Sequence, residues 1–268
     1  MTEPQVPPQE AQIKIIGIGH SGSDALEQMI ECNVPGVEFI HVHSGTRSLP
    51  KSRAHRRLGG DTAAAAMQDI LAAISDTGLL FITPGMDCGA DTLAAAAIAH
   101  AARKMNVVTV GLAIASCENP ALAELQAHVD SLIVANDSNA HFLFKGVVRE
   151  IAAILNEYNC VNVDITDVRT VMREPGRAMM GSAQASGPDR ARIAATQAVA
   201  GMCLSHAKAM LVLVTAAKGS LKLSESRLAM GAINACSSPT AHVLYGVARD
   251  EALGDSVRVS VVATGLPG

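Results

Sequence analysis

The sequence predicts a mixed α/β fold in which helices pack on a parallel, doubly wound sheet. Short apolar strands alternate with helical patterns through the N-terminal half, as right-handed crossovers between parallel strands require. Hydrophobic residues make up 49% of the 268 residues but aromatic residues only 2%, so the core has to be built from aliphatic side chains. That composition favours helices packed closely on a parallel sheet.

The first predicted elements are a strand over 13–18, a glycine-rich turn and a helix over 24–32. The alternation continues with a strand over 37–43, a helix over 62–75, a strand over 79–83, a helix over 92–104, and strands over 107–113 and 131–135. In such a sheet the ligand crevice lies at the carboxyl ends of the strands. We therefore expect the two glycine-bearing turns, 17–22 and 85–92, to lie side by side at that edge.

The rest of the chain predicts a buried helix and a second, smaller α/β unit. Residues 139–158 are apolar around most of a helical circumference, which suits a helix enclosed between two layers. Further helices are predicted near 189–205 and 224–235, and strands over 210–215, 241–247 and 257–263. The predicted domains are a flexible arm over 1–12, a Rossmann-like domain over 13–138, a central helix over 139–158 and a C-terminal α/β domain over 159–268.

Composition and charge exclude several classes of function. The net charge is -4, with 21 Lys and Arg against 25 Asp and Glu, and no basic stripe suggests a nucleic-acid partner. The six cysteines are dispersed without a C-x-x-C pair, as expected for reduced thiols in the cytoplasm. No apolar run reaches the roughly 18 residues of a membrane span, so direct membrane insertion is not expected.

Three stretches of the chain resemble proteins of the tubulin/FtsZ superfamily. The FtsZ opening, a strand leading into G-x-G-G-G-G-G-N-A, is similar to IKIIGIGHSGSDALEQMIECNVPGVEFIHV. The end of the FtsZ central helix, N-x-D-F-A-D-V-x-T-V-M, is similar to VNVDITDVRTVMREPGRAMMG, and the closing strand resembles ALGDSVRVSVVATG. Three blocks in the family's order are more specific than a lone glycine-rich loop, which dinucleotide enzymes also use.

This resemblance implies a site for GTP or GDP with Mg²⁺ at the glycine turns. In the family, the nucleotide lies across the strand ends, and small residues expose backbone N–H groups to its phosphates. The matching positions in this chain are Gly17, Gly19, Ser21, Gly22, Gly85, Met86, Gly89 and Thr92.

The resemblance also implies a second, catalytic set of residues and a partner. In the family, the loop after the central helix reaches the nucleotide of the next subunit, so that polymerisation completes the active site. The matching polar residues are Asn162, Asp164 and Asp167, although both aspartates equally suit caps around a turn. The implied partner is the chain itself in a head-to-tail filament, or a conventional FtsZ, in the bacterial cytoplasm.

The nucleotide half departs from the family pattern in charge. Asp87 and Asp91 replace glycines, Asp24 replaces an asparagine, and Phe142 stands near the place of the guanine-reading aspartate. Two like charges about 4 Å apart repel by roughly 4 kcal/mol at an effective dielectric near 20. The sequence therefore predicts weak or absent GTP hydrolysis, or no cofactor at all. Asp24 and Asp91 also suit helix N-caps, which would stabilise the fold without serving GTP.

Two other enzymatic interpretations stay open at this point. The retained glycines could still hold phosphates in an active, GTP-dependent polymer. Alternatively, Gly17-x-Gly19-x-x-Gly22 after a strand, with Glu38 about twenty residues further on, is the pattern of an NAD-type oxidoreductase. That pattern leaves the C-terminal blocks unexplained.

A metal site is a third alternative. His41 and His43 alternate onto one face of a predicted strand, and His20, Asp87, Cys88 or Asp91 could converge on them from neighbouring turns. Strand histidines are, however, more often satisfied core or rim residues, so the sequence favours no metal.

Overall fold

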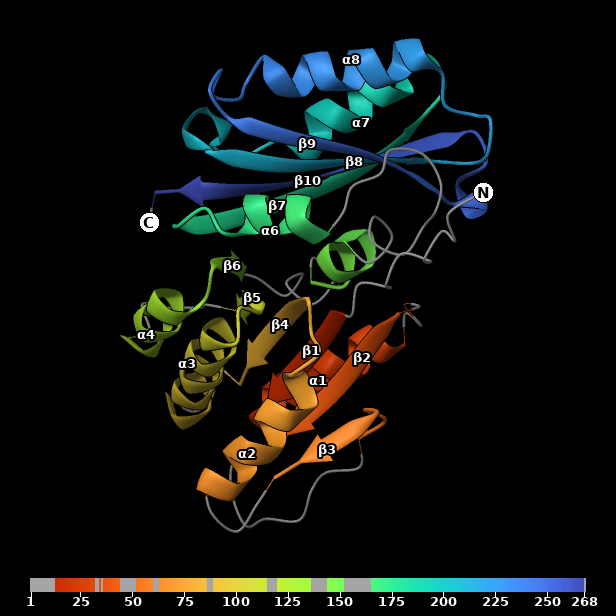
Figure 1. Cartoon of the computed structure of the whole chain (residues 1–268). Coiled ribbons are helices and arrows are strands. Elements are labelled where there is room, and N and C mark those ends of the chain that lie inside the picture. The colour runs from red at the N-terminus through yellow and green to blue at the C-terminus, as the bar shows by residue number, and fades with distance from the viewer. Residues whose placement is uncertain are drawn as a thin grey trace, which may run out of the picture.

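The computed structural model describes residues 13–31, 34, 36–43, 52–59, 63–85, 89–114, 120–135, 144–151 and 165–267. These residues form a mixed α/β fold around one ten-stranded sheet, in the order β3-β2-β1-β4-β5-β6-β7-β10-β8-β9 (Figure 1). The fold class predicted from the sequence is confirmed. Among the helices that the structure describes, none combines the length and apolarity needed to cross a membrane.

The N-terminal half is a parallel sheet with β1 at its centre. Its strands are β1 (Ile13–Ile18), β2 (Val37–Val42), β3 (Arg56–Leu58), β4 (Leu79–Pro84), β5 (Val108–Ile114) and β6 (Ser131–Ala135). Strand β1 pairs with β2 and β4, with Gly17 opposite His41 on one side and Thr83 on the other. The carboxyl ends of these three strands therefore meet at one edge.

Helices cover both faces of this sheet, as a doubly wound fold requires. The N-terminal helices are α1 (Gly19–Ile30), α2 (Ala63–Ile74), α3 (Gly89–Lys104) and α4 (Pro120–His128). Ile13 and Ile15 pack with α1 on one face, whereas Ile16 and Ile18 pack with α2, α3 and α4 on the other. This alternation follows from the two-residue period of a strand.

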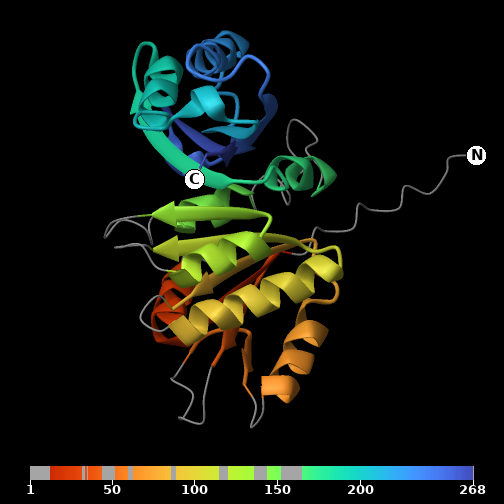
Figure 2. The same ribbon diagram turned by 90° about the vertical axis from the view of Figure 1, so that its left-hand side faces the viewer.

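The C-terminal half continues the same sheet with a mixed arrangement. Its elements are α6 (Ile165–Met172), β7 (Arg177–Ser186), α7 (Arg190–Ala198), the short turn η1 (Leu204–His206), β8 (Ala209–Ala216), α8 (Leu223–Asn234), β9 (His242–Arg249), η2 (Glu251–Leu253) and β10 (Ser256–Leu266). Strand β10 is antiparallel to β7 and β8, whereas β8 and β9 are parallel. Figure 2 shows α7 and α8 on the side of these strands away from the N-terminal half.

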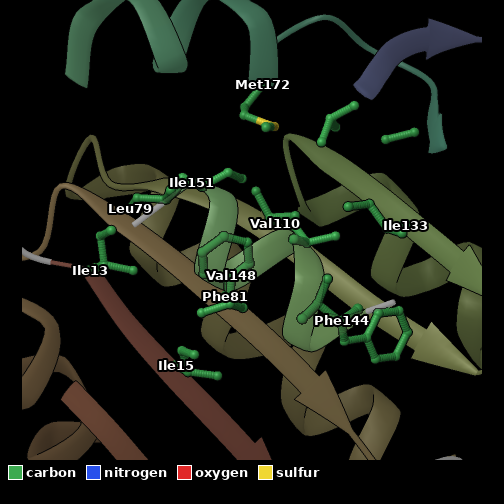
Figure 3. Close-up of a cluster of buried hydrophobic side chains, with 14 of the residues drawn as sticks. Ile13, Ile15, Leu79, Phe81, Val110, Ile133, Phe144, Val148, Ile151 and Met172 are labelled. Carbon is green, nitrogen blue, oxygen red and sulfur yellow. The ribbon is translucent and has the colours of Figure 1, made fainter. Parts of the chain in front are cut away.

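The predicted central helix is buried where the structure describes it. Residues 144–151 are helical, and Phe144, Val147, Val148 and Ile151 are fully buried. They pack against strand residues of the N-terminal half and against Met172 of α6 (Figure 3). The remaining parts of the predicted helix, 139–143 and 152–158, lie outside the described residues.

Two strands, two helices and several helix boundaries differ from the sequence prediction. Helices α4 and α6 were not predicted, α3 begins at Gly89 instead of 92, and α7 ends at Ala198 instead of 205. Strand β3 is only three residues long and carries Arg56 and Arg57, so no apolar pattern marks it. Strand β7 is rich in small and partly exposed residues, which hides its strand character. Helix α1 begins at Gly19 instead of 24, because the glycine-rich turn itself forms the first helical turn. The limits of the domains stay a prediction, and the arm over 1–12 lies outside the described residues.

Candidate functional site

The two glycine turns lie against each other at the carboxyl edge of β1 and β4, as predicted. The Gly85 amide donates a hydrogen bond to the Ile18 carbonyl at 2.7 Å. A Cβ built on Gly22 would lie only 2.6 Å from the Thr83 carbonyl oxygen. The first turn of α1 thus approaches the end of β4 so closely that a side chain at Gly22 would force them apart.

The glycines of the first turn are required by the fold itself. Gly19 has a φ of 73°, which favours glycine. Gly17 and Gly22 have no positive φ; instead, a Cβ on Gly17 would lie 2.7 Å from the Gly22 carbonyl oxygen. Conformation accounts for one glycine and close backbone approach for the other two, whether or not a nucleotide binds.

The Asp91 carboxylate occupies the space between the two turns. Asp91 lies in the first turn of α3 and is 6% exposed. A Cβ on Gly19 would lie 1.8 Å from Asp91 Oδ2, and one on Gly85 would lie 2.8 Å from the same atom. A negatively charged oxygen is therefore already packed against the backbone at the start of α1.

Neither aspartate that was predicted to cap a helix is an N-cap. Asp91 lies within α3, which already includes Gly89. Asp24 lies inside α1, whose N-cap is Ile18, and its carboxylate is 4.0 Å from His20 on an exposed surface. Both predictions were wrong because the glycine residues that precede each aspartate are already helical.

The other residues predicted to bind the nucleotide differ in burial and in their surroundings. Thr92 is fully buried, and its Oγ1 has no hydrogen-bond partner among the described residues. Gly89 is exposed, with open space where a Cβ would stand. Ser21 Oγ lies 3.3 Å from the Cβ position of Gly85, beside Asp91 Oδ2. Met86 lies outside the described residues. The Asp91 carboxylate takes up the space beside Gly19.

A buried pair of hydrogen bonds through Ser23 connects β2 to the first glycine turn. Ser23 Oγ donates to the Gly19 carbonyl and lies 2.5 Å from His41 Nε2. His41 is fully buried, and burial lowers its pKa, an effect that the neighbouring His43 and Arg57 reinforce and Glu27 opposes. Sequence reasoning missed Ser23, although its place four residues after Gly19 is the spacing of a side chain that bonds back to a helical carbonyl.

The described residues do not bring a metal site together around these histidines. The rings of His41 and His43 lie edge to face with centroids 6.4 Å apart. His20 points into solvent with an 82% exposed side chain. No group of three or more potential metal ligands occurs within the described ranges, and Asp87 and Cys88 lie outside them.

Glu38 takes part in a structural ion-pair network. It stands in β2 directly opposite Lys14 of β1, near the amino ends of both strands. Its carboxylate is 3.1 Å from the buried Lys14 Nζ and 2.7 Å from Arg56 Nε. The residue proposed to bind a ribose thus lies at the opposite edge from the glycine turns, which does not support an NAD-type site.

Helix α6, which follows the predicted catalytic loop in the sequence, ends at the opposite edge of the same sheet. Ser131, the first residue of β6, donates a hydrogen bond to the Met172 carbonyl at 2.6 Å, so α6 ends at the amino edge. Arg173 binds Asn106, in the turn before β5, at that same edge. Asp167 lies in the first turn of α6. Asn162 and Asp164 lie outside the described residues.

Solved structures share this architecture. A tryptophan-to-tyrosine mutant of FtsZ from M. jannaschii has a TM-score of 0.82 at 23% identity, over 96% of this chain and 92% of that one. An empty FtsZ dimer from M. jannaschii has a TM-score of 0.80 at 23% identity, over 96% and 89%. A doubly wound sheet with two glycine turns, joined through a buried helix to a mixed α/β half, is therefore the fold of the tubulin/FtsZ class.

Sequence comparison narrows this class to one family. The profile of the FtsZ family, C-terminal domain, matches residues 176–267. The cell division protein FtsZ of Neisseria meningitidis is 33% identical over 96% of this chain and 78% of the relative. The chain belongs to the FtsZ family. That alignment runs over 307 positions against the 268 residues here, so the relative carries segments that this chain lacks.

Proposed function

We propose that this chain assembles head to tail into cytoskeletal filaments in the bacterial cytoplasm, as a cell-division-type protein with weak or absent GTP hydrolysis. One observation carries the assembly part of this proposal. The glycine turns lie at the carboxyl edge of the sheet, whereas the end of α6, which follows the predicted catalytic loop, lies at the amino edge.

Opposite edges are what a head-to-tail contact needs. The loop with Asn162, Asp164 and Asp167 would dock on the glycine turns of the next subunit, so each subunit offers two different surfaces. Such a contact is heterologous and does not have to close, so it can propagate into a filament. The FtsZ dimer from M. jannaschii supports self-association as a property of the fold's relatives.

The negative charge at the glycine turns supports weak binding of GTP. Proteins of the FtsZ family bind GTP or GDP, but here the buried Asp91 carboxylate packs against Gly19 and Gly85. A phosphate oxygen placed about 4 Å from that carboxylate would meet roughly 4 kcal/mol of repulsion at a dielectric near 20. Binding in the micromolar range would therefore fall by two orders of magnitude or more.

Sedimentation and electron microscopy, with and without GTP and Mg²⁺, test the proposal. Wild type is expected to assemble equally under both conditions, and phosphate release is expected to stay near background. The Asp164→Lys, Asp167→Lys variant should stay folded and fail to assemble. Asp69→Lys, on the exposed surface of α2, is a charge-reversal control away from the predicted loop and should assemble as wild type.

Different results would contradict the two parts of the proposal, the head-to-tail interface and the weak GTP hydrolysis. Wild type that stays monomeric at high concentration, or a double-Lys variant that assembles normally, would rule out the head-to-tail interface. Brisk GTP hydrolysis on assembly would leave the interface standing but would identify the chain as a conventional polymerising GTPase.

A further inference from the structure

We propose that the Asp91 carboxylate is a built-in anion: it takes the place of a phosphate at the paired strand–helix junctions and keeps them assembled without a ligand. The inference deepens the proposed function, because it supplies a reason for assembly without nucleotide. The consequence for assembly depends on the proposed function. The assignment of Asp91 as an internal anion depends only on the geometry of the two junctions.

The carboxylate lies where backbone geometry favours a negative charge. Helix α1 starts at Gly19 and α3 includes Gly89, and both starts adjoin the carboxyl ends of β1 and β4. The first N–H groups of a helix have no partner within the helix, and the helix dipole adds a partial positive charge there. Such ends attract phosphate and carboxylate groups.

Helix α1 has no cap from its own sequence. Its N-cap is Ile18, whose side chain cannot accept a hydrogen bond, and its first turn contains no acidic residue. Asp91 is distant in sequence but places Oδ2 directly against Gly19, the first residue of α1. An anion from α3 therefore stands at the start of α1, where local capping is missing.

The same carboxylate is enclosed by the second turn. Its Oδ2 also lies against Gly85, whose amide bonds to the Ile18 carbonyl. With Asp91 only 6% exposed, the group is held inside the fold and is not a surface charge. A side chain on Gly19 or Gly85 would collide with it, so the space at both junctions is shaped around this carboxylate.

Occupation by an internal anion has two consequences. A free phosphate group would have to share the space and the N–H groups with a like charge, so its binding is weak. The junctions, which form one surface of the proposed interface, are already arranged. Removing the carboxylate should then leave an empty anion site, and the stability of the protein should depend on an added anion that fills it.

The test compares wild type with Asp91→Gly and Asp91→Asn by thermal unfolding in pyrophosphate, against chloride at the same ionic strength. Asp91→Asn keeps the size of the side chain and removes its charge. Each variant is expected to lose about 4 °C in chloride and to recover most of it in pyrophosphate. Wild type and the control Asp69→Asn should show no pyrophosphate-specific shift. By calorimetry, Asp91→Gly should bind pyrophosphate at least tenfold more tightly than wild type.

The outcomes separate this inference from the proposed function. Variants that lose stability without recovery in pyrophosphate would mean that the carboxylate only packs or caps, and would overturn the inference. Equal pyrophosphate binding by wild type would also overturn it. If Asp91→Gly does not fold, the Asp91→Asn result decides. Failure of wild type to form filaments would refute the proposed function but would leave the pyrophosphate results intact.

Discussion

Individual glycines at the carboxyl edge differ in how much room surrounds them. Gly22 is enclosed by the end of β4, whereas Gly89 faces open space. Both match glycine positions of the family's two nucleotide turns, so the resemblance alone assigns them the same role. Local packing separates them: Gly22 is needed for the first turn of α1 to pack on the end of β4, and Gly89 is free of that constraint.

The pair supplies a matched test by alanine substitution. Gly22→Ala should lower the free energy of unfolding by about 2 kcal/mol, because the new methyl group overlaps the Thr83 carbonyl. Gly89→Ala should change it by about 0.5 kcal/mol or less. Urea unfolding measures both. A Gly22→Ala protein as stable as wild type would show that α1 can move away from the end of β4 at little cost.

Burial of His41 makes stability depend on pH. Burial lowers its folded-state pKa below the value of 6.5 for an exposed histidine. The unfolded chain then takes up a proton first as pH falls, so this contribution is complete above pH 6.5 and declines as pH drops towards the folded pKa. His41→Gln should flatten the decline in stability between about pH 7.5 and 5.5.

Unfolding in urea across this pH range measures the effect. His20→Gln is the control, because the His20 side chain is 82% exposed. It should leave the pH profile of wild type unchanged. Parallel profiles for wild type and His41→Gln would exclude His41 as the source of the pH dependence.

At the scale of elements, the buried helix ties the two halves of the molecule together by charge as well as by packing. Glu150 is 4% exposed, and its Oε1 lies 3.1 Å from Arg258 Nε of β10. That contact is an ion pair without hydrogen-bond alignment, since Arg258 Nε has no hydrogen-bond partner among the described residues. Thr215 of β8 donates to the other Glu150 oxygen at 3.4 Å. The helix thus contacts both halves.

Removing the Glu150 charge should be costly. Glu150→Gln is expected to lower the free energy of unfolding by about 2–3 kcal/mol, because it leaves the largely buried Arg258 with Asp250 as its remaining acidic partner. Arg149→Gln, which removes the more exposed cation beside Glu150, should cost under about 1 kcal/mol. A double variant, Glu150→Gln with Arg258→Met, should recover part of the loss in urea unfolding.

At the scale of the whole molecule, the sheet is continuous, but its two halves are joined by a short stretch of strand pairing. The halves join through β6 and β7, which pair at Leu132 with Arg177 and at Ile133 with Ala178. The glycine turns and the end of α6 occupy opposite edges of the N-terminal sheet (Figure 1). This polarity of the subunit is the basis for the proposed filament.

Assembly without a nucleotide cycle should respond to salt more than to nucleotide. The screening length falls from about 10 Å at 0.1 M salt to about 3 Å at 1 M. We expect the sedimented fraction to change over that range and to be equal with GTP, GDP or no nucleotide. Light scattering after dilution measures turnover, which should be slow. A sedimented fraction that requires GTP at every salt concentration would contradict this expectation.

The sequence by itself determined the alternation of strands and helices, the buried helix and the meeting of the two glycine turns. These features depend on periodic apolar residues and on the geometry of parallel sheets, both of which can be recognised within a short window. The family resemblance identified the positions of the turns. It did not distinguish Gly22 from Gly89, because room for a side chain depends on neighbours from another strand.

Only the tertiary structure decided where α1 begins and what stands at its start. Asp24 is of a residue type that is common at N-caps. The helix nevertheless starts at Gly19, because the turn packs against the end of β4. The short β3 and the partly exposed β7 likewise depend on the strands beside them. Asp91 reaches Gly19 across the sheet edge from a different helix. Such a contact is set by the packing of β1 against β4, and no local pattern of residues encodes it.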